Sequence, residues 1–104
     1  MGIDIERVRA VDEAGIARRF FAPSEVAAIE GLSGSERTAA FFRCWARKEA
    51  YVKGLGTGLR TPLSSFEADR VEGWSVVDLE VPEGYAGALA VAGPNPIWTY
   101  VRRA

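Results

Sequence analysis

Trp45-Ala46-Arg47-Lys48-Glu49-Ala50-Tyr51-Val52-Lys53-Gly54 is the stretch that decides the fold, because it predicts a helix with charged side chains on its apolar side. At about 100° per residue, one arc of this helix is apolar. The members of that arc are Phe41, Trp45, Val52 and Leu55, with Phe42 at its edge. Lys48 falls inside the arc, and Glu49 lies at its edge, one turn before Lys53. An unpaired buried charge costs several kcal/mol, so another group must meet these charges.

Three further side chains of the same helix have simpler expectations. Arg43 and Arg47 fall on the opposite side, where we expect both in solvent. Cys44, the single cysteine, lies near the apolar arc, and inert packing explains it better than a role as nucleophile. The chain has no histidine, which excludes Ser-His and Cys-His catalysis and the commonest zinc sites.

The composition predicts one small domain over residues 1–104. A content of 48% hydrophobic and 26% charged residues is typical of a globular protein. The net charge of −1 gives no electrostatic reason to bind nucleic acid. No apolar run approaches the ~20 residues that span a bilayer, and residues 1–4 do not resemble a signal peptide. We therefore expect a cytoplasmic protein.

Hydrophobic periodicity and turn residues predict an α+β domain, with helices packed on a mainly antiparallel sheet. A first strand is expected over 2–8, and a helix over 12–20. Ser24 could cap a second helix that ends at Glu30, and residues 33–36 fit a capping box before the long helix, which runs to about Gly54. Further strands are predicted at 65–70, 74–81, 86–92 and 97–102.

Three carboxylates suggest a metal site. Asp4 and Glu6 are two residues apart on the first strand, so both point to one face, and Glu49 adds a third oxygen donor. Such an all-oxygen set suits Mg²⁺ or Mn²⁺, and Lys53 and Lys48 could meet the phosphates that Mg²⁺ commonly bridges. Two simpler interpretations remain open: a solvated strand face for the first pair, and an internal ion pair for the lysine and glutamate of the helix.

Five segments together resemble the 4′-phosphopantetheinyl transferases. The order and spacing of the first three match the signature segments of that superfamily, and the last two resemble the surfactin-synthetase-activating type. The segments are Gly2-Ile3-Asp4-Ile5-Glu6, Arg19-Phe20-Phe21-Ala22-Pro23-Ser24-Glu25, Trp45 through Lys53, Gly54-Leu55-Gly56-Thr57-Gly58-Leu59 and Pro62-Leu63-Ser64-Ser65-Phe66.

The resemblance implies an enzyme that transfers the 4′-phosphopantetheine arm of coenzyme A to a serine of an apo acyl or peptidyl carrier protein. It implies Asp4, Glu6 and Glu49 as Mg²⁺ ligands, and Lys53 and Lys48 as residues that bind coenzyme A phosphate and stabilise its charge during transfer. The glycine-rich turn at Gly56 would touch the coenzyme. The serine proton would go to Glu49 or to a metal-bound water. Glu25 aligns with a family glutamate near the site, although a helix-start carboxylate explains it equally well.

The length of the chain leaves two interpretations open. Surfactin-type enzymes have two similar halves, and this chain corresponds to the second. It is therefore either a transferase that self-associates as a dimer or trimer, or a half that needs a separate first half. The competing function is a non-catalytic half-domain that binds a carrier protein or coenzyme A. Arginines toward the start of the chain could dock an acidic carrier protein, although solvated surface charge is their default role.

Overall fold

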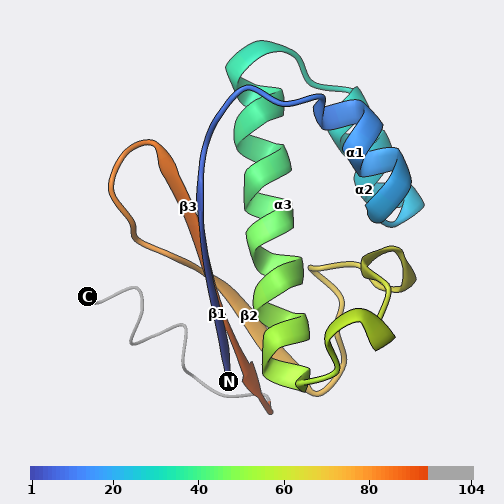
Figure 1. The fold of residues 1–104 in the computed structure, drawn as a ribbon, viewed down its shortest axis with the longest axis vertical. Coiled ribbons are helices and arrows are strands. Elements are labelled where there is room, and N and C mark those ends of the chain that lie inside the picture. Colours follow the sequence, from blue (N-terminus) through green and yellow to red (C-terminus); the bar gives the residue numbers. More distant parts are fainter. Residues whose placement is uncertain (94–104) are drawn as a thin grey trace.

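The computed structural model describes residues 1–93 and shows a long helix lying on one face of a three-stranded sheet (Figure 1). The elements in chain order are β1 (Gly2–Arg7), α1 (Glu13–Phe20), α2 (Pro23–Glu30), α3 (Gly34–Leu55), the short turns η1 (Gly58–Arg60) and η2 (Leu63–Ser65), β2 (Trp74–Leu79) and β3 (Tyr85–Ala92). The strand order is β1-β3-β2, and both pairings are antiparallel. The predicted α+β class is therefore confirmed. None of the described residues form a helix long and apolar enough to cross a membrane.

β1 and the last turns of α3 meet closely at two glycines. A Cβ atom on Gly2 would lie 2.0 Å from the Ala50 carbonyl oxygen, and one on Gly54 would lie 2.8 Å from the Trp74 ring. No side chain fits into such a space, so glycine is needed at both positions. The close approach brings Asp4, two residues further along β1, opposite the α3 side chains that matter for the site.

The core has an aromatic part and an alanine part. The aromatic part joins α1, α2 and the first half of α3, and its buried members are Ala17, Phe21, Ile29, Phe41 and Phe42. The alanine part is the contact between α3 and β3, made by Ala46, Ala50, Ala88 and Ala90. Because these four side chains are so small, the second half of α3 can lie close to the sheet.

The predicted strand over 2–8, the helix over 12–20 and the long helix are confirmed with small shifts at their ends. The second helix, however, begins at Pro23, so the prediction that Ser24 caps it is wrong. Proline favours the first helical position, and Ala22 becomes the N-cap, with its amide donating to Glu25 Oε1 at 3.0 Å. Ser33 is the N-cap of α3, but its side chain makes no capping hydrogen bond, so the predicted capping box does not form.

Of the other predicted strands, 74–81 and 86–92 are confirmed as β2 and β3, and 97–102 lies outside the described residues. The strand predicted over 65–70 is wrong. This segment follows the η2 turn, and its backbone bonds to side chains rather than to a neighbouring strand. The Phe66 carbonyl oxygen accepts from Lys48, and the Ala68 amide donates to Glu25. Periodicity along a segment does not show where its backbone hydrogen bonds go.

The expectation that Arg47 lies in solvent is also wrong. Arg47 is only 8% exposed and donates to Asp78 at 2.9 Å and to the Val76 carbonyl oxygen at 3.0 Å, which ties α3 to β2. Its second guanidinium nitrogen lies 3.0 Å from Asp69. Arg43 is half-exposed, as predicted, and pairs with the same Asp78. The sheet edge thus supplies carboxylates that the helical pattern alone could not reveal.

Candidate active site

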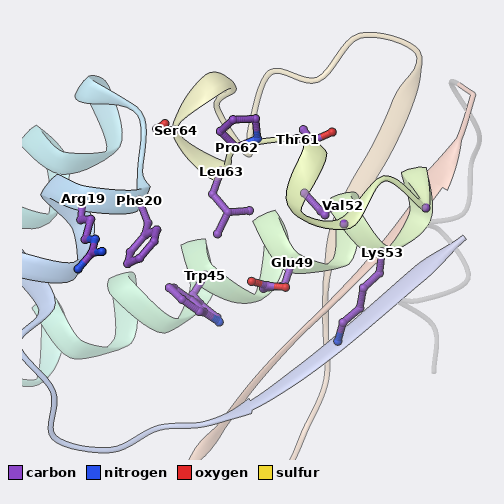
Figure 2. Close-up of a pocket in the computed structure, with 12 residues that line it drawn as sticks. Arg19, Phe20, Trp45, Glu49, Val52, Lys53, Thr61, Pro62, Leu63 and Ser64 are labelled. Carbon is purple, nitrogen blue, oxygen red and sulfur yellow. The ribbon is translucent and has the colours of Figure 1, made fainter.

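A cavity of about 780 Å³ lies where the last turns of α3 face the segment that follows that helix (Figure 2). Its lining comes from three places: Trp45, Glu49, Val52 and Lys53 of α3; Gly56, Gly58, Thr61, Pro62, Leu63 and Ser64 after it; and Arg19 and Phe20 at the end of α1. Figure 2 shows the Leu63 side chain pointing across the cavity toward Trp45 and Glu49. The cavity therefore has apolar walls and a charged end.

The charged end is built on an ion pair between β1 and α3. Lys53 Nζ donates to Asp4 Oδ1 at 2.6 Å. The Asp4 side chain is 4% exposed, whereas the Lys53 side chain is 52% exposed. The hydrogen bond to Asp4 raises the pKa of Lys53, which keeps the ammonium charged. Since an ammonium has three donors, Lys53 can hold Asp4 and still offer N–H groups to an anion in the cavity.

Two more carboxylates lie in the field of Asp4. Burial raises the pKa of Glu6 to about 7, helped by the adjacent Asp4, with which a protonated Glu6 can hydrogen bond. Burial, and next the negative charge of Asp4, raise the pKa of Glu49 against the opposing effect of Lys53. The three carboxylates predicted as metal ligands therefore share one region of negative potential, which favours a proton or a cation.

One oxygen of Asp4 marks where such a cation would fit. Asp4 Oδ2 is buried and has no hydrogen-bond partner among the described residues. A buried carboxylate oxygen is costly unless a proton or a cation meets it, and an all-oxygen donor set suits a hard divalent ion. Within residues 1–93, however, no three acidic, histidine or cysteine side chains stand close enough to hold a metal as they are. The structure brings Asp4, Glu6 and Glu49 into one neighbourhood, but not into a finished coordination shell.

Lys48, predicted beside these residues, lies apart from the cavity lining. Its side chain is 0% exposed, and its Nζ donates to Glu25 Oε1 and to the Phe66 carbonyl oxygen. The internal ion pair that the sequence left open, between Lys48 and its neighbour Glu49, is not found among the described residues; Lys48 pairs instead with Glu25 of α2. Glu25 also keeps its expected place in the first turn of α2.

Gly56 lies where the sequence placed it, at the turn that ends α3, with a left-handed backbone (φ 73°), and it lines the cavity. Sequence reasoning missed the side chains of Arg19, Phe20 and Leu63. Arg19 and Phe20 belong to a quoted motif, yet nothing in their spacing showed that the end of α1 reaches the cavity. Leu63 was assigned to a strand entry, so its position over α3 could not be foreseen.

Cys44 takes no part in the chemistry of this site. Burial raises the pKa of its thiol to about 12, so the thiol stays protonated at neutral pH and is a poor nucleophile. The prediction of inert packing for Cys44 is confirmed. The chemistry of the cavity must rest on its carboxylates and on Lys53.

Comparison with known proteins gives a consistent result. The model of the 4′-phosphopantetheinyl transferase superfamily matches residues 1–86. The chain is 33% identical to the 4′-phosphopantetheinyl transferase HetI of a Nostoc species, over 89% of this chain and 44% of that protein. It is 34% identical to the 4′-phosphopantetheinyl transferase Sfp of Bacillus subtilis, over 83% of this chain and 38% of that protein.

A shorter relative also matches. The chain is 36% identical to the holo-[acyl-carrier-protein] synthase of Streptococcus agalactiae, over 56% of this chain and 54% of that protein. In contrast, the chain spans less than half the length of the HetI and Sfp proteins.

Proposed function

Because the chain belongs to the 4′-phosphopantetheinyl transferase superfamily, we propose that it carries the catalytic half of a 4′-phosphopantetheinyl transferase. The reaction moves the phosphopantetheine group of coenzyme A to a serine of an apo acyl or peptidyl carrier protein. The observation that supports this most directly is the cavity itself. Its apolar walls meet Glu49 and Lys53, and Lys53 in turn holds Asp4, which lies behind the lining; a pyrophosphate transfer needs groups of this kind.

In this proposal the carboxylates Asp4, Glu6 and Glu49 hold Mg²⁺, with Mn²⁺ as a possible substitute. The unpartnered Asp4 Oδ2 and the raised pKa values of Glu6 and Glu49 support the assignment. When bound, the ion neutralises negative charge on the pyrophosphate of coenzyme A. No histidine or thiolate competes as a ligand at this end of the cavity, within the residues that line it.

Lys53 and Glu49 then have separate roles in the transfer at the reacting phosphorus. The carrier serine oxygen attacks the phosphorus that bears pantetheine, and the bond from that phosphorus to the bridging oxygen breaks, releasing adenosine 3′,5′-bisphosphate. Lys53, charged and half-exposed, holds the pyrophosphate and stabilises the negative charge on the leaving phosphate. Glu49, whose pKa is raised chiefly by burial, accepts the serine proton.

The remaining lining residues would position coenzyme A. The pantetheine arm is uncharged, so an apolar wall such as the one formed by Trp45 and Leu63 suits it. Gly56 presents backbone without a side chain at the same cavity, which leaves room for close contact with the coenzyme. Lys48 remains part of the proposed site. Because its side chain is completely buried, it would act by positioning other residues rather than by contacting phosphate.

The assembly that carries out the reaction is part of the proposal. Because the chain spans less than half of its longer relatives, the site would be completed by a second copy, in a dimer or trimer, or by a separate first half. The same observation favours the alternative, a non-catalytic half-domain that binds a carrier protein or coenzyme A. Both versions place the chain in the cytoplasm.

Mass spectrometry of an apo carrier protein, incubated with the chain, coenzyme A and Mg²⁺, tests the proposal. We expect the carrier to gain the mass of phosphopantetheine, and EDTA to prevent the gain. Calorimetric titration with coenzyme A separates the alternatives. Binding without transfer to any of several carriers would support the half-domain, and a folded chain that neither transfers nor binds, even after a first half is added, would refute both.

A further inference from the structure

The role of Lys48, the buried lysine of α3, is not explained by the metal-binding and phosphate-binding residues proposed above. The Lys48 ammonium is 0% exposed, lies 4.3 Å from the centre of the Phe66 ring and 5.6 Å from that of Phe21, and is absent from the cavity lining. It therefore cannot touch a ligand in the cavity. A charge is retained at such a position only when its partners satisfy it, so its role must be read from them.

The main partner, Glu25, joins three separate parts of the chain through one carboxylate. Its Oε1 accepts from the Ala22 amide at 3.0 Å and from Lys48, and its Oε2 accepts from the Ala68 amide at 2.8 Å. Lys48 adds a bond of its own to the Phe66 carbonyl oxygen. The pair thus fastens the start of α2, the middle of α3 and the backbone of residues 66–68 together.

The fastened backbone immediately follows a wall of the cavity. Residues 61–64 line the cavity and include Leu63, which points toward Trp45 and Glu49 (Figure 2). This wall contains only the single turn η2, and the strand predicted after it does not form. A segment without a ladder of its own keeps its place through the groups that hold its backbone. Here those groups are Glu25 and Lys48.

We infer that the buried Glu25–Lys48 pair positions the 61–68 segment as the wall of the coenzyme cavity, so that Lys48 is a positioning residue and not a residue that binds phosphate. The inference rests on the proposed function for the identity of the ligand. The anchoring itself concerns only the contacts of this chain, and can be measured without any ligand.

The first measurement is amide hydrogen exchange of the chain alone. In Lys48→Met, exchange at residues 66–68 should become at least about 10-fold faster, while exchange in β3 changes much less. Glu30→Gln is the matched control, because it removes the exposed Arg18–Glu30 pair of the same helix α2, whose contact is made away from the segment. Equal protection of residues 66–68 in wild type and Lys48→Met would overturn the inference.

The second measurement is the kinetics of transfer. Loosening a wall weakens binding of coenzyme A, so we expect KM for coenzyme A to rise about 10-fold in Lys48→Met, with kcat at saturation reduced far less. A loss confined to kcat would instead indicate a contact made in the transition state, and would overturn the inference.

The double variant Glu25→Gln/Lys48→Met guards against misfolding, because it leaves no unpaired buried charge. If the two residues act as one unit, its KM should be no worse than that of either single variant. Losses that add up would overturn the inference. A wild-type chain that binds no coenzyme A, even after a first half is added, would refute the proposed function, whereas the exchange experiment would still decide whether the pair anchors the segment.

Discussion

The carboxylates near the charged end of the cavity repel one another, and a bound cation would relieve this repulsion. Burial raises the pKa of Glu6 and of Glu49, the charge of Asp4 adds to this rise, and Lys53 offsets only part of the effect at Glu49. Groups arranged for stability alone would not be kept in this state, and strongly perturbed carboxylates in a cavity are typical of functional sites.

Glu49→Gln should abolish transfer without harming the fold. Removing the proposed base should lower kcat by at least about 100-fold. Because the variant also removes a negative charge near Asp4, its melting temperature in EDTA should equal or exceed that of wild type. Calorimetry and the carrier mass assay measure both quantities. Glu36→Gln, at the exposed start of α3, is the control and should change neither.

The pKa of Glu6 makes stability depend on pH in a defined direction. Between the ordinary pKa of a glutamate, 4.5, and about 7, the folded chain keeps a proton that the unfolded chain has lost, so this group stabilises the fold below that pH window, and the contribution is lost as pH rises through it. Melting temperature in EDTA should therefore fall from pH 5 to pH 7.5 relative to Glu6→Gln.

Magnesium should oppose this fall in melting temperature, because the cation neutralises the Glu6 carboxylate in place of the proton. Its apparent affinity should in turn weaken at pH 6 relative to pH 8, since Mg²⁺ must then displace the Glu6 proton. Titration calorimetry at the two pH values measures this. An affinity independent of pH would contradict the assignment of Glu6 as a ligand.

Secondary-structure elements show how far the sequence could be read. The strand at 2–8 and the long helix were predicted because periodicity is strong there and glycines mark the helix end. The cap at Ser24 failed for a local reason, because Pro23 takes the first helical position and makes Ala22 the N-cap. The strand at 65–70 and the exposure of Arg47 failed for another physical reason: each depends on partners distant in sequence, Glu25 with Lys48 for the strand and Asp78 for Arg47. The same reason hid Arg19, Phe20 and Leu63 from the predicted site.

The contact of α3 with the sheet gives a prediction at the scale of elements. Gly54→Ala places a methyl group 2.8 Å from the Trp74 ring of β2, so the ring or the helix must shift, and we expect a loss of about 1–3 kcal/mol in the free energy of unfolding. Gly31→Ala is the control, because its new methyl group would meet only ordinary contacts of 3.5 Å or more. Urea denaturation measures the free energy of unfolding of both variants. Equal values for the two would show that the contact at Gly54 is looser than described.

At the scale of the molecule, residues 1–93 form one helix-on-sheet unit, and the chain spans less than half the length of the HetI and Sfp proteins. On the sheet face opposite α3, Ile3 and Ile5 are 50% and 55% exposed, an unusual state for isoleucine on the strand that carries the site. This exposure agrees with the proposal that another chain or another half completes the enzyme.

If a second copy completes the site, specific activity should depend on protein concentration. Activity per chain should rise across the same range in which sedimentation shows monomers associating. A strictly monomeric chain with constant specific activity would rule out completion by self-association, and addition of a separate first half would then be the next test.

The alanine layer between α3 and β3 means that the site can be tuned from a distance. Asp4 pairs in register with Ala88 on β3, and Ala88 packs against the helix that carries Lys53. The thickness of this alanine layer therefore sets the distance between the Asp4 carboxylate and the Lys53 ammonium. A larger residue at position 88 would push α3 away from the sheet and so widen the gap between the two charged groups. We therefore expect activity to be sensitive to substitution of these alanines, although they carry no functional group.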